Sequence, residues 1–260
     1  HRSNDTDSYD RSRLSRQTCP FRGYYTMNRA GLQLFTSQIE EDIDVGTDLA
    51  DLILHHFDLN DGDIMVVTQK VVSKAEGQVL EVVDDDQESF DALVRSESRR
   101  ILRRRGTLTI TETHHGFICA NAGIDRSNTD AGTVTLLPKD PDRSARRLLH
   151  QLQYRSGVRL AVLITDTFGR TWRSGVTDVA IGVAGLTPIA DLRGTRDHNG
   201  VPLQATEVCI ADEIAAAADL IKRKDGRTPF VLVRGVDTAH FGLGSIGTDV
   251  VRGYGFDLFR

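Results

Sequence analysis

Apolar residues recur at helical and strand spacings along most of the chain. In residues 46–57 (GTDLADLILHHF) they return every three or four positions, which predicts a short amphipathic helix with Thr47 or Asp48 as its N-cap. A turn over 60–63 leads into residues 64–72 (IMVVTQKVV), whose continuous apolar run predicts a buried strand. Chemistry commonly collects where such strands end.

The middle of the chain shows a basic helix pattern followed by an extended one. Residues 88–105 predict a helix with a heavily basic last turn, closed by Gly106, and residues 108–120 (LTITETHHGFICA) predict an extended segment. The arginines 103–105 suit a solvated helix C-terminus or a phosphate clamp, and the first use is the commoner one.

The second half again alternates between helix and strand. Pro141 marks the start of a helix that Gly157 ends, and a strand follows over 158–169. Residues 207–224 predict a helix with a small-residue face, and 229–235 a further strand. The spacing lacks the regularity of a βαβ series and no repeat is visible, so we expect a mixed α+β fold.

Composition narrows the function classes. The 260 residues are 39% hydrophobic and 27% charged, with a net charge of −5, so no general attraction to nucleic acid is expected. No apolar run is long enough for a membrane span. Cys19, Cys119 and Cys209 are too far apart for a zinc motif or a disulfide framework, which favours a reducing cytoplasm. Residues 1–26 predict a disordered extension, leaving 27–260 as the folded part.

Two strand ends carry the most informative chemistry. In residues 119–128 (CANAGIDRSN) a strand gives way to small residues and then to Asp125, and in residues 164–170 (ITDTFGR) a strand ends at Asp166 and Thr167. Carboxylate and hydroxyl oxygens suit a hard divalent cation such as Mg²⁺ or Mn²⁺. Either acid alone could instead close a turn or cap a helix.

Other signals are weaker. Residues 242–247 satisfy GxGxxG, but no adequate helix follows, so a dinucleotide fold is not expected. The adjacent pairs His55-His56 and His114-His115 point to different sides of a helix or strand, so neither predicts a two-histidine metal clamp. Lys74 is placed to reach phosphate oxygens, although such a lysine is more often a surface residue.

Several segments together resemble the coenzyme F420-0:L-glutamate ligase (γ-glutamyl ligase) family. They are VVTQKVVSKAEG, THHGFICANAGIDRSN, LLPKDPDRSAR, ITDTFGRTWRSGVTDVAIGVAGL, TEVCIADEIAAAADL and VLVRG, in order over residues 46–235. The resemblance implies an α+β homodimer with intertwined subunits. It implies a ligase that uses GTP, two divalent ions (Mn²⁺ or Mg²⁺) and K⁺ to add L-glutamate to the terminal carboxylate of F420-0. A division of 27–260 into two subdomains stays open.

The resemblance also implies roles for individual residues. Asp125 and Asp166 match the family's metal ligands, and Thr167 matches a position beside a second metal. A second group matches positions that contact the nucleotide: Gln69, Lys70, Lys74, Asn128 and Lys224. No catalytic side chain is assigned.

Three segments depart from the family pattern. Residues 38–42 (QIEED) are acidic where the family has Gly-Ile-Pro, and we expect them to repel phosphate. Residues 222–226 (KRKDG) replace a loop that begins Met-Gly, and the C-terminal tail lacks an acidic run. A divergent ligase for another carboxylate and amine, a metal-dependent phosphohydrolase and a catalytically weak binding protein are therefore alternatives.

Overall fold

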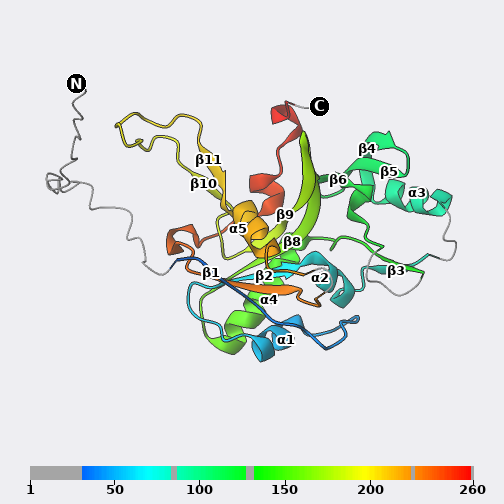
Figure 1. Cartoon of the computed structure of the whole chain (residues 1–260), viewed down its shortest axis with the longest axis horizontal. Helices are drawn as coiled ribbons and strands as arrows, with labels where there is room; N and C mark the ends of the chain where they lie inside the picture. Colours follow the sequence, from blue (N-terminus) through cyan, green and yellow to red (C-terminus); the bar gives the residue numbers. More distant parts are fainter. Residues whose placement is uncertain (1–30, 83–86, 127–131, 224–225, 259–260) are drawn as a thin grey trace, which may run out of the picture. The chain divides into compact units, whose positions relative to one another are not determined.

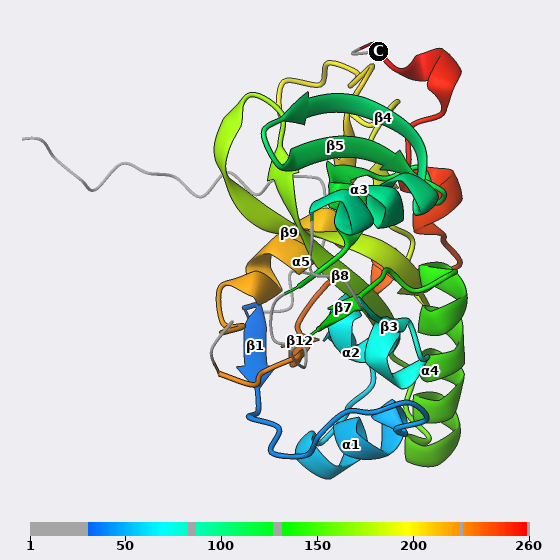
Figure 2. The same cartoon turned by 90° about the vertical axis from the view of Figure 1, so that its right-hand side faces the viewer.

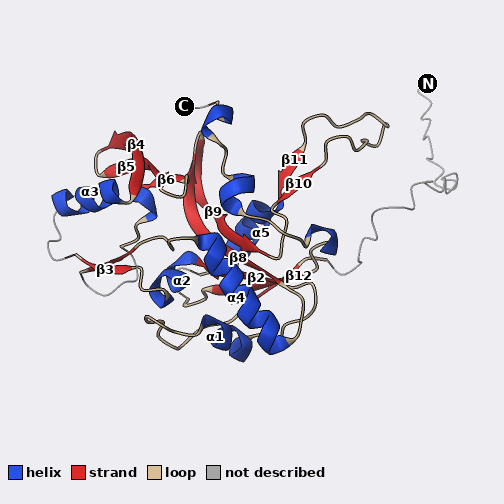
Figure 3. Ribbon diagram, turned by 180° about the vertical axis from the view of Figure 1, so that it is seen from behind, coloured by secondary structure: helices blue, strands red, loops and turns tan. Residues whose placement is uncertain are grey.

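The structure is a computed structural model that describes residues 31–82, 87–126, 132–223 and 226–258. The extension expected over 1–26 lies outside this part of the chain. Within it, helices combine with separate β-sheets of five, three, two and two strands (Figures 1 and 3). This architecture confirms the predicted mixed α+β class.

The largest sheet has the strand order β1-β12-β2-β8-β9. Strands β2 and β8 run parallel, and every other neighbouring pair in this sheet is antiparallel. Because parallel strands end at the same edge, Thr68 at the end of β2 lies opposite Thr165 in β8. The strands are β1 (Gln33–Thr36), β12 (Phe230–Arg234), β2 (Ile64–Thr68), β8 (Ala161–Arg170) and β9 (Arg173–Ala184).

Three helices cover this sheet and complete the main core. They are α1 (Leu49–His56), α4 (Pro141–Ser156) and α5 (Ile210–Asp219). Asp48 caps α1, Asp140 caps α4, and Gly157 ends α4 in a left-handed conformation with φ 74°. The helices predicted over 46–57 and from Pro141 to Gly157 are therefore confirmed.

Two sequence predictions are wrong at their ends. The strand predicted over 64–72 stops at Thr68, and helix α2 (Gln69–Ala75) follows, because an apolar run this short does not distinguish a buried strand from a buried helix. The helix predicted over 88–105 is α3 (Gln87–Ser96) followed by strand β4 (Ser98–Arg105).

The basic segment extends because it pairs with the next strand. Strand β4 forms an antiparallel ladder with β5 (Leu108–Thr113), and Glu112 of β5 forms ion pairs with Arg99 and Arg100. These cross-strand contacts stabilise a sheet, which local helix propensity does not predict. Strand β6 (Ile118–Ala120) completes this three-stranded sheet (Figure 1), and Figure 2 shows β4 and β5 side by side beside α3.

The remaining strands form two short ribbons. β3 (Val79–Glu81) pairs with β7 (Thr133–Thr135), and β10 (Ile189–Asp191) pairs with β11 (Glu207–Cys209). The helix predicted over 207–224 is thus shorter than expected, because its first three residues belong to β11 and α5 ends at Asp219. No helix in the described ranges is long and apolar enough to cross a membrane.

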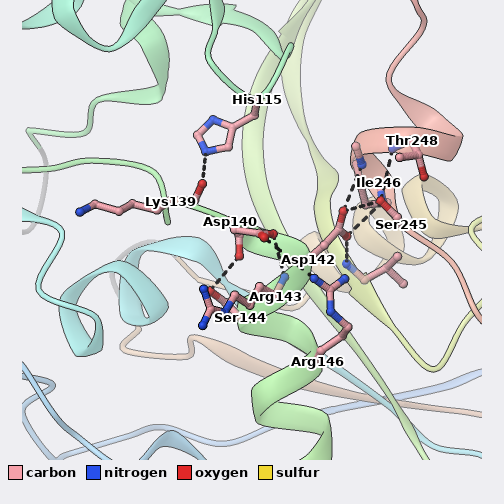
Figure 4. Close-up of polar contacts among 12 residues, drawn as sticks. His115, Lys139, Asp140, Asp142, Arg143, Ser144, Arg146, Ser245, Ile246 and Thr248 are labelled. Atoms are coloured by element: carbon pink, nitrogen blue, oxygen red, sulfur yellow. Dashed lines mark hydrogen bonds and ion pairs between the residues drawn. The ribbon is translucent and has the colours of Figure 1, made fainter.

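Asp142 fixes the C-terminal segment to the core. Its carboxylate accepts hydrogen bonds from Ser245 Oγ at 2.7 Å, Ile246 N at 3.0 Å and Gly247 N at 3.1 Å (Figure 4). It also accepts one from Val183 N of β9 at 2.9 Å. One buried acid therefore joins the first turn of α4, strand β9 and the glycine-rich segment 242–247. This segment thus has a structural role.

Candidate functional site

Two predicted site residues meet directly beside the C-terminal end of β2, next to the middle of β8. The Lys70 ammonium, in the first turn of α2, lies 2.7 Å from a carboxylate oxygen of Asp125. Asp166 in β8 lies close enough to both residues for their charges to act on its carboxyl group. Segments that are distant in the sequence thus converge on one place. The prediction that a strand ends at Asp166 is wrong, because β8 continues to Arg170 by pairing with β9.

A left-handed turn delivers Asp125 to this place. Asn121, Ala122 and Gly123 have φ values of 50°, 58° and 72°, a conformation that favours small residues and asparagine. A Cβ atom on Gly123 would lie 2.8 Å from the Leu137 side chain. After the turn, the backbone of Asp125 exchanges two 2.9 Å hydrogen bonds with Thr135. The small residues before the acid are therefore needed to position it.

Asp166 is a partly buried carboxyl group in an acidic neighbourhood. Its pKa is raised to about 7, chiefly by burial and also by the negative charges of Asp178 and Asp125. The hydrogen bond from Thr167 N at 2.9 Å and the Lys70 charge oppose this rise. The charge of Asp166 in turn adds to burial in raising the pKa of the Cys119 thiol to about 12. Asp166 is therefore a group whose ionised form needs a further cation.

A buried ion pair lies beside Asp166. Asp178, in β9, accepts hydrogen bonds from Thr165 Oγ1 at 3.0 Å and Thr167 Oγ1 at 2.7 Å, and it is paired with the Lys222 ammonium. Lys222 also donates to Thr165 Oγ1 at 2.8 Å. The Asp178 and Lys222 side chains are only 4% and 8% exposed. This network joins β8, β9 and the loop after α5.

The donor set fits a hard divalent cation. The described cluster contains three carboxylates (Asp125, Asp166 and Asp178) and two ammonium groups (Lys70 and Lys222), so negative charge is in excess when all are ionised. Carboxylate oxygens are the ligands that Mg²⁺ and Mn²⁺ prefer. A divalent ion would stabilise the ionised form of Asp166 more strongly than Lys70 alone does.

The other predicted residues lie in different environments. Lys74 is four residues after Lys70, on the same face of α2. Gln69 is 1% exposed and accepts a hydrogen bond from Ser73 Oγ at 2.9 Å. Thr167 follows Asp166 on the strand, so its side chain leaves the opposite face and bonds Asp178. Asn128 and Lys224 lie outside the described residues.

Three arginines of the β8–β9 hairpin and the β10–β11 ribbon, Arg170, Arg173 and Arg193, either bond protein groups or are exposed. Arg193 makes two bonds to Asp191, at 2.8 and 2.6 Å, and an ion pair with Glu207 at 3.2 Å, so it stabilises the β10–β11 ribbon. Arg170 donates to the Ser174 carbonyl at 3.2 Å within the β8–β9 hairpin. Arg173 is exposed.

The acidic segment over 38–42 has a basic partner that the sequence did not reveal. Arg227 donates to the carbonyls of Ile39 at 2.8 Å, Glu40 at 2.8 Å and Glu41 at 3.0 Å, and to the Asp42 carboxylate at 3.0 Å. One guanidinium thus holds this segment against the loop that precedes β12 and offsets part of its negative charge.

A cavity of about 370 Å³ lies beside the cluster. Val179, the residue directly opposite Asp166 across the β8–β9 pair, lines it together with Phe168. Its volume lies in the range of small-molecule sites. The other lining residues are Gly116, Phe117, Ile118, Ala180, Asp212, Ile246, Val250, Val251, Arg252 and Asp257.

The sequence did not identify Asp178 or Lys222 as site residues. Asp178 precedes the apolar run VAIGVA, and its contact with Thr165 and Thr167 depends on the register of β9 against β8. An acid ahead of a buried run was the available signal. Lys222 is recognisable only once the loop after α5 is folded against this hairpin.

The fold and this acidic, lysine-containing cluster define a mixed α+β protein with a site suited to cations and phosphates. The family model for F420-0:gamma-glutamyl ligase matches residues 39–235. The chain therefore belongs to the F420-0:gamma-glutamyl ligase family, whose members are ligases.

Curated relatives are similar over most of their length. A coenzyme F420:L-glutamate ligase of Methanothermobacter thermautotrophicus is 42% identical over 238 residues, covering 84% of this chain and 94% of the relative. The proteins of the same name from Methanopyrus kandleri and Archaeoglobus fulgidus are 37% and 38% identical, covering 85% and 83% of this chain and 95% and 91% of the relatives. The resemblance seen in the sequence is thus confirmed at the level of the family.

Proposed function

We propose that this chain joins L-glutamate to the terminal carboxylate of coenzyme F420-0 in a reaction that consumes GTP. The names of the similar proteins support the substrates. The single observation that carries the mechanism is the meeting of the Lys70–Asp125 pair with Asp166. This arrangement supplies both signs of charge that a metal–triphosphate complex requires.

The reaction needs an activated acyl group because a carboxylate is a poor acyl donor. A carboxylate oxygen of F420-0 attacks the γ-phosphorus of GTP, and the bond to the β-phosphate oxygen breaks to give GDP and an acyl phosphate. The glutamate amine then attacks the acyl carbon, loses a proton and expels inorganic phosphate. One amide bond forms for each GTP consumed.

We assign the metal role to Asp125, Asp166 and Thr167. When bound there, Mn²⁺ or Mg²⁺ would screen negative charge on the phosphates during transfer. Asp125 and Asp166 offer carboxylate oxygens to one ion, and the Thr167 hydroxyl, which bonds Asp178 on the opposite face of β8, would lie beside the second ion. The proposal includes two divalent ions and K⁺ as a monovalent cofactor.

We assign nucleotide contacts to three residues of α2 and to two residues outside the described part of the chain. Lys70 and Lys74 project from one face of α2 and would hold phosphate oxygens. Gln69, Asn128 and Lys224 complete the proposed set. Lys222 is not among them, because its ammonium is buried against Asp178 and positions the strand that carries Asp166.

The cavity beside Asp166 is the proposed place for the flavin-like acceptor. Phe117 and Phe168 lie with ring centroids 6.1 Å apart and give it an aromatic wall. Phe168→Ala should raise the KM for F420-0 and leave the KM for GTP unchanged. Equal changes in both constants would argue against this assignment.

We also propose a homodimer that acts in the cytoplasm, with 27–260 as its ligase domain. Trp172 is 87% exposed at the turn between β8 and β9, and Val176 is 58% exposed in the same hairpin. Large exposed apolar side chains commonly mark subunit contacts. Light scattering after size exclusion should give twice the chain mass for the wild type and a lower mass for Trp172→Ser; a monomeric wild type would contradict the proposal.

The function is tested by incubating the purified protein with F420-0, GTP, Mn²⁺ and L-glutamate and measuring product mass. We expect glutamyl additions that require every component. GTP turnover that is equally fast without glutamate and F420-0 would favour the phosphohydrolase. Glutamate-independent amide formation with another amine, or no reaction with F420-0, would favour a ligase with different substrates.

A further inference from the structure

A second group of potential ligand atoms lies at the C-terminal end of α1. Single side-chain atoms of Glu41, His55 and His56 all lie within 4.8 Å of one another. The sequence argued against His55 and His56 as a pair, since neighbours on a helix diverge. They occupy the last two positions of α1, and their rings approach edge to face with centroids 5.1 Å apart. In the structure, one ligand atom of each histidine nonetheless lies within 4.8 Å of the other and of Glu41.

His56 is already oriented as a metal ligand would be. Its Nδ1 lies 3.1 Å from the Ser37 hydroxyl, which fixes the ring. Its Nε2 is buried and makes no hydrogen bond to any described residue. Metal-binding histidines typically use one ring nitrogen for the ion and the other for an orienting hydrogen bond. Nε2 of His56 is thus directed at the space beside Glu41.

The spacing of His56 and Glu41 fits coordination better than direct bonding. Nε2 of His56 is 3.4 Å from Oε2 of Glu41, which is long for a charge-assisted hydrogen bond. Two ligand atoms about 2.1 Å from a tetrahedral ion lie about 3.4 Å apart. His55 is exposed, so a small rotation of its ring completes the set without disturbing the core.

We propose that Glu41, His55 and His56 bind a divalent transition-metal ion of the Zn²⁺ class. Two imidazoles and one carboxylate suit Zn²⁺, Co²⁺ or Ni²⁺, whereas Mg²⁺ prefers oxygen ligands alone. This site shares no residue with the Asp125–Asp166 cluster. Because Glu41 and His55 are exposed, solvent would supply the remaining ligands.

The site would join two parts of the fold. Glu41 lies on the segment between β1 and α1, and its carbonyl accepts a hydrogen bond from Arg227. An ion held by Glu41 and the end of α1 would therefore fix this segment, and Arg227 would extend the constraint to the loop before β12. It would also offset the acidic charge over 38–42. We expect Zn²⁺ to raise the melting temperature of the protein.

The test is calorimetric titration of the full chain with Zn²⁺ in the presence of excess Mg²⁺, which occupies the oxygen site. Glu41→Gln, His55→Gln and His56→Gln should each weaken the strongest Zn²⁺ site by roughly a hundredfold, and Ser37→Ala by about tenfold. His198→Gln, which changes an exposed histidine in the loop between β10 and β11, is the matched control. It should bind as the wild type does.

Two further measurements separate this site from the proposed ligase site. Asp166→Asn should keep the Zn²⁺ site, and the Co²⁺-loaded wild type should show the visible absorption of a nitrogen-coordinated ion that His55→Gln loses. If the variant at the half-buried His56 does not fold, the variants at the exposed residues Glu41 and His55 still test the proposal. Wild-type Zn²⁺ affinity in both of these variants would overturn the proposal. An equal loss of Zn²⁺ affinity in His198→Gln would also overturn it. Neither result depends on the ligase activity.

Discussion

The Lys70 ammonium contacts the Asp125 carboxylate at 2.7 Å, which joins the first turn of α2 to the segment paired with β7. Because of this ion pair, the carboxylates of Asp125 and Asp166 do not face each other without a cation nearby. In the proposed function, this lysine would exchange its partner for a phosphate when a metal ion binds Asp125. Charge neutralisation would then be shared between protein and ligands.

Lys70→Met should raise the KM for GTP by roughly tenfold or more, because one phosphate contact of about 1.5–3 kcal/mol is lost. The affinity for Mn²⁺ without nucleotide should increase slightly, since a competing cation is removed. Steady-state kinetics and metal titration check both. Lys139→Met, at an exposed lysine before α4, is the control. An unchanged KM for GTP would restrict Lys70 to a structural role.

The metal-free protein should lose stability as the pH rises from about 4 to about 7. The pKa of Asp166 is about 7 in the folded protein, and an unfolded aspartate titrates near about 3.9. Between these values the folded state binds more protons, so its stability falls with increasing pH. Asp166→Asn should flatten this slope in thermal melts with a chelator present.

Added Mn²⁺ should reverse that loss. The ion replaces the proton on Asp166, so the rise in melting temperature should be larger at pH 8 than at pH 5. A stabilisation that is the same at both pH values would show that Asp166 is not part of the metal site.

Lys222→Met should destabilise the fold by about 3–5 kcal/mol, because it leaves the buried Asp178 without its cation. Adding Asp178→Asn should recover part of this loss. Urea denaturation of both single variants and the double variant measures the coupling. Arg193→Met breaks an exposed ion pair with Asp191 and should cost no more than about 1 kcal/mol. Equal losses for Lys222 and Arg193 would contradict the account.

Gly182→Ala should destabilise the protein by about 2 kcal/mol or more. A Cβ atom there would lie 2.4 Å from the Pro141 carbonyl oxygen, so α4 would have to move away from β9. Gly169→Ala is a matched change in the paired strand, with nothing within 4 Å of the new Cβ, and should stay within about 0.5 kcal/mol. Urea denaturation midpoints of the two variants, compared at an unchanged m-value, distinguish these effects.

Local signals predicted the parts of the fold that local interactions determine. The start of α1 near Asp48, the start of α4 at Pro141 and its end at Gly157 were predictable because each signal acts within a few residues. Helix α2 and strand β4 were not, because tertiary packing and cross-strand pairing decide their form. The apolar pair Val71-Val72 is buried in helix α2, and the same two residues would also suit a buried strand.

The candidate site also contains residues that the sequence predicts and residues that only the tertiary structure reveals. Asp125 and Asp166 were predicted from the small or apolar residues that precede each acid, although neither acid lies at a strand end, since β8 continues to Arg170 and β6 stops at Ala120. The partners Asp178, Lys222 and Arg227 were not, because each contact depends on the register of β9 or on the course of the loop between α5 and β12. The cluster of Glu41 with the two histidines likewise requires the return of the chain after β1.

Mn²⁺ binding in the presence of GTP, followed by electron paramagnetic resonance, tests the shared metal site most directly. The account predicts that Asp125→Asn and Asp166→Asn each weaken binding by about a hundredfold, while Asp51→Asn, at an exposed acid of α1, does not change it. Wild-type Mn²⁺ affinity in either of the first two variants would contradict the convergence of these carboxylates on one ion.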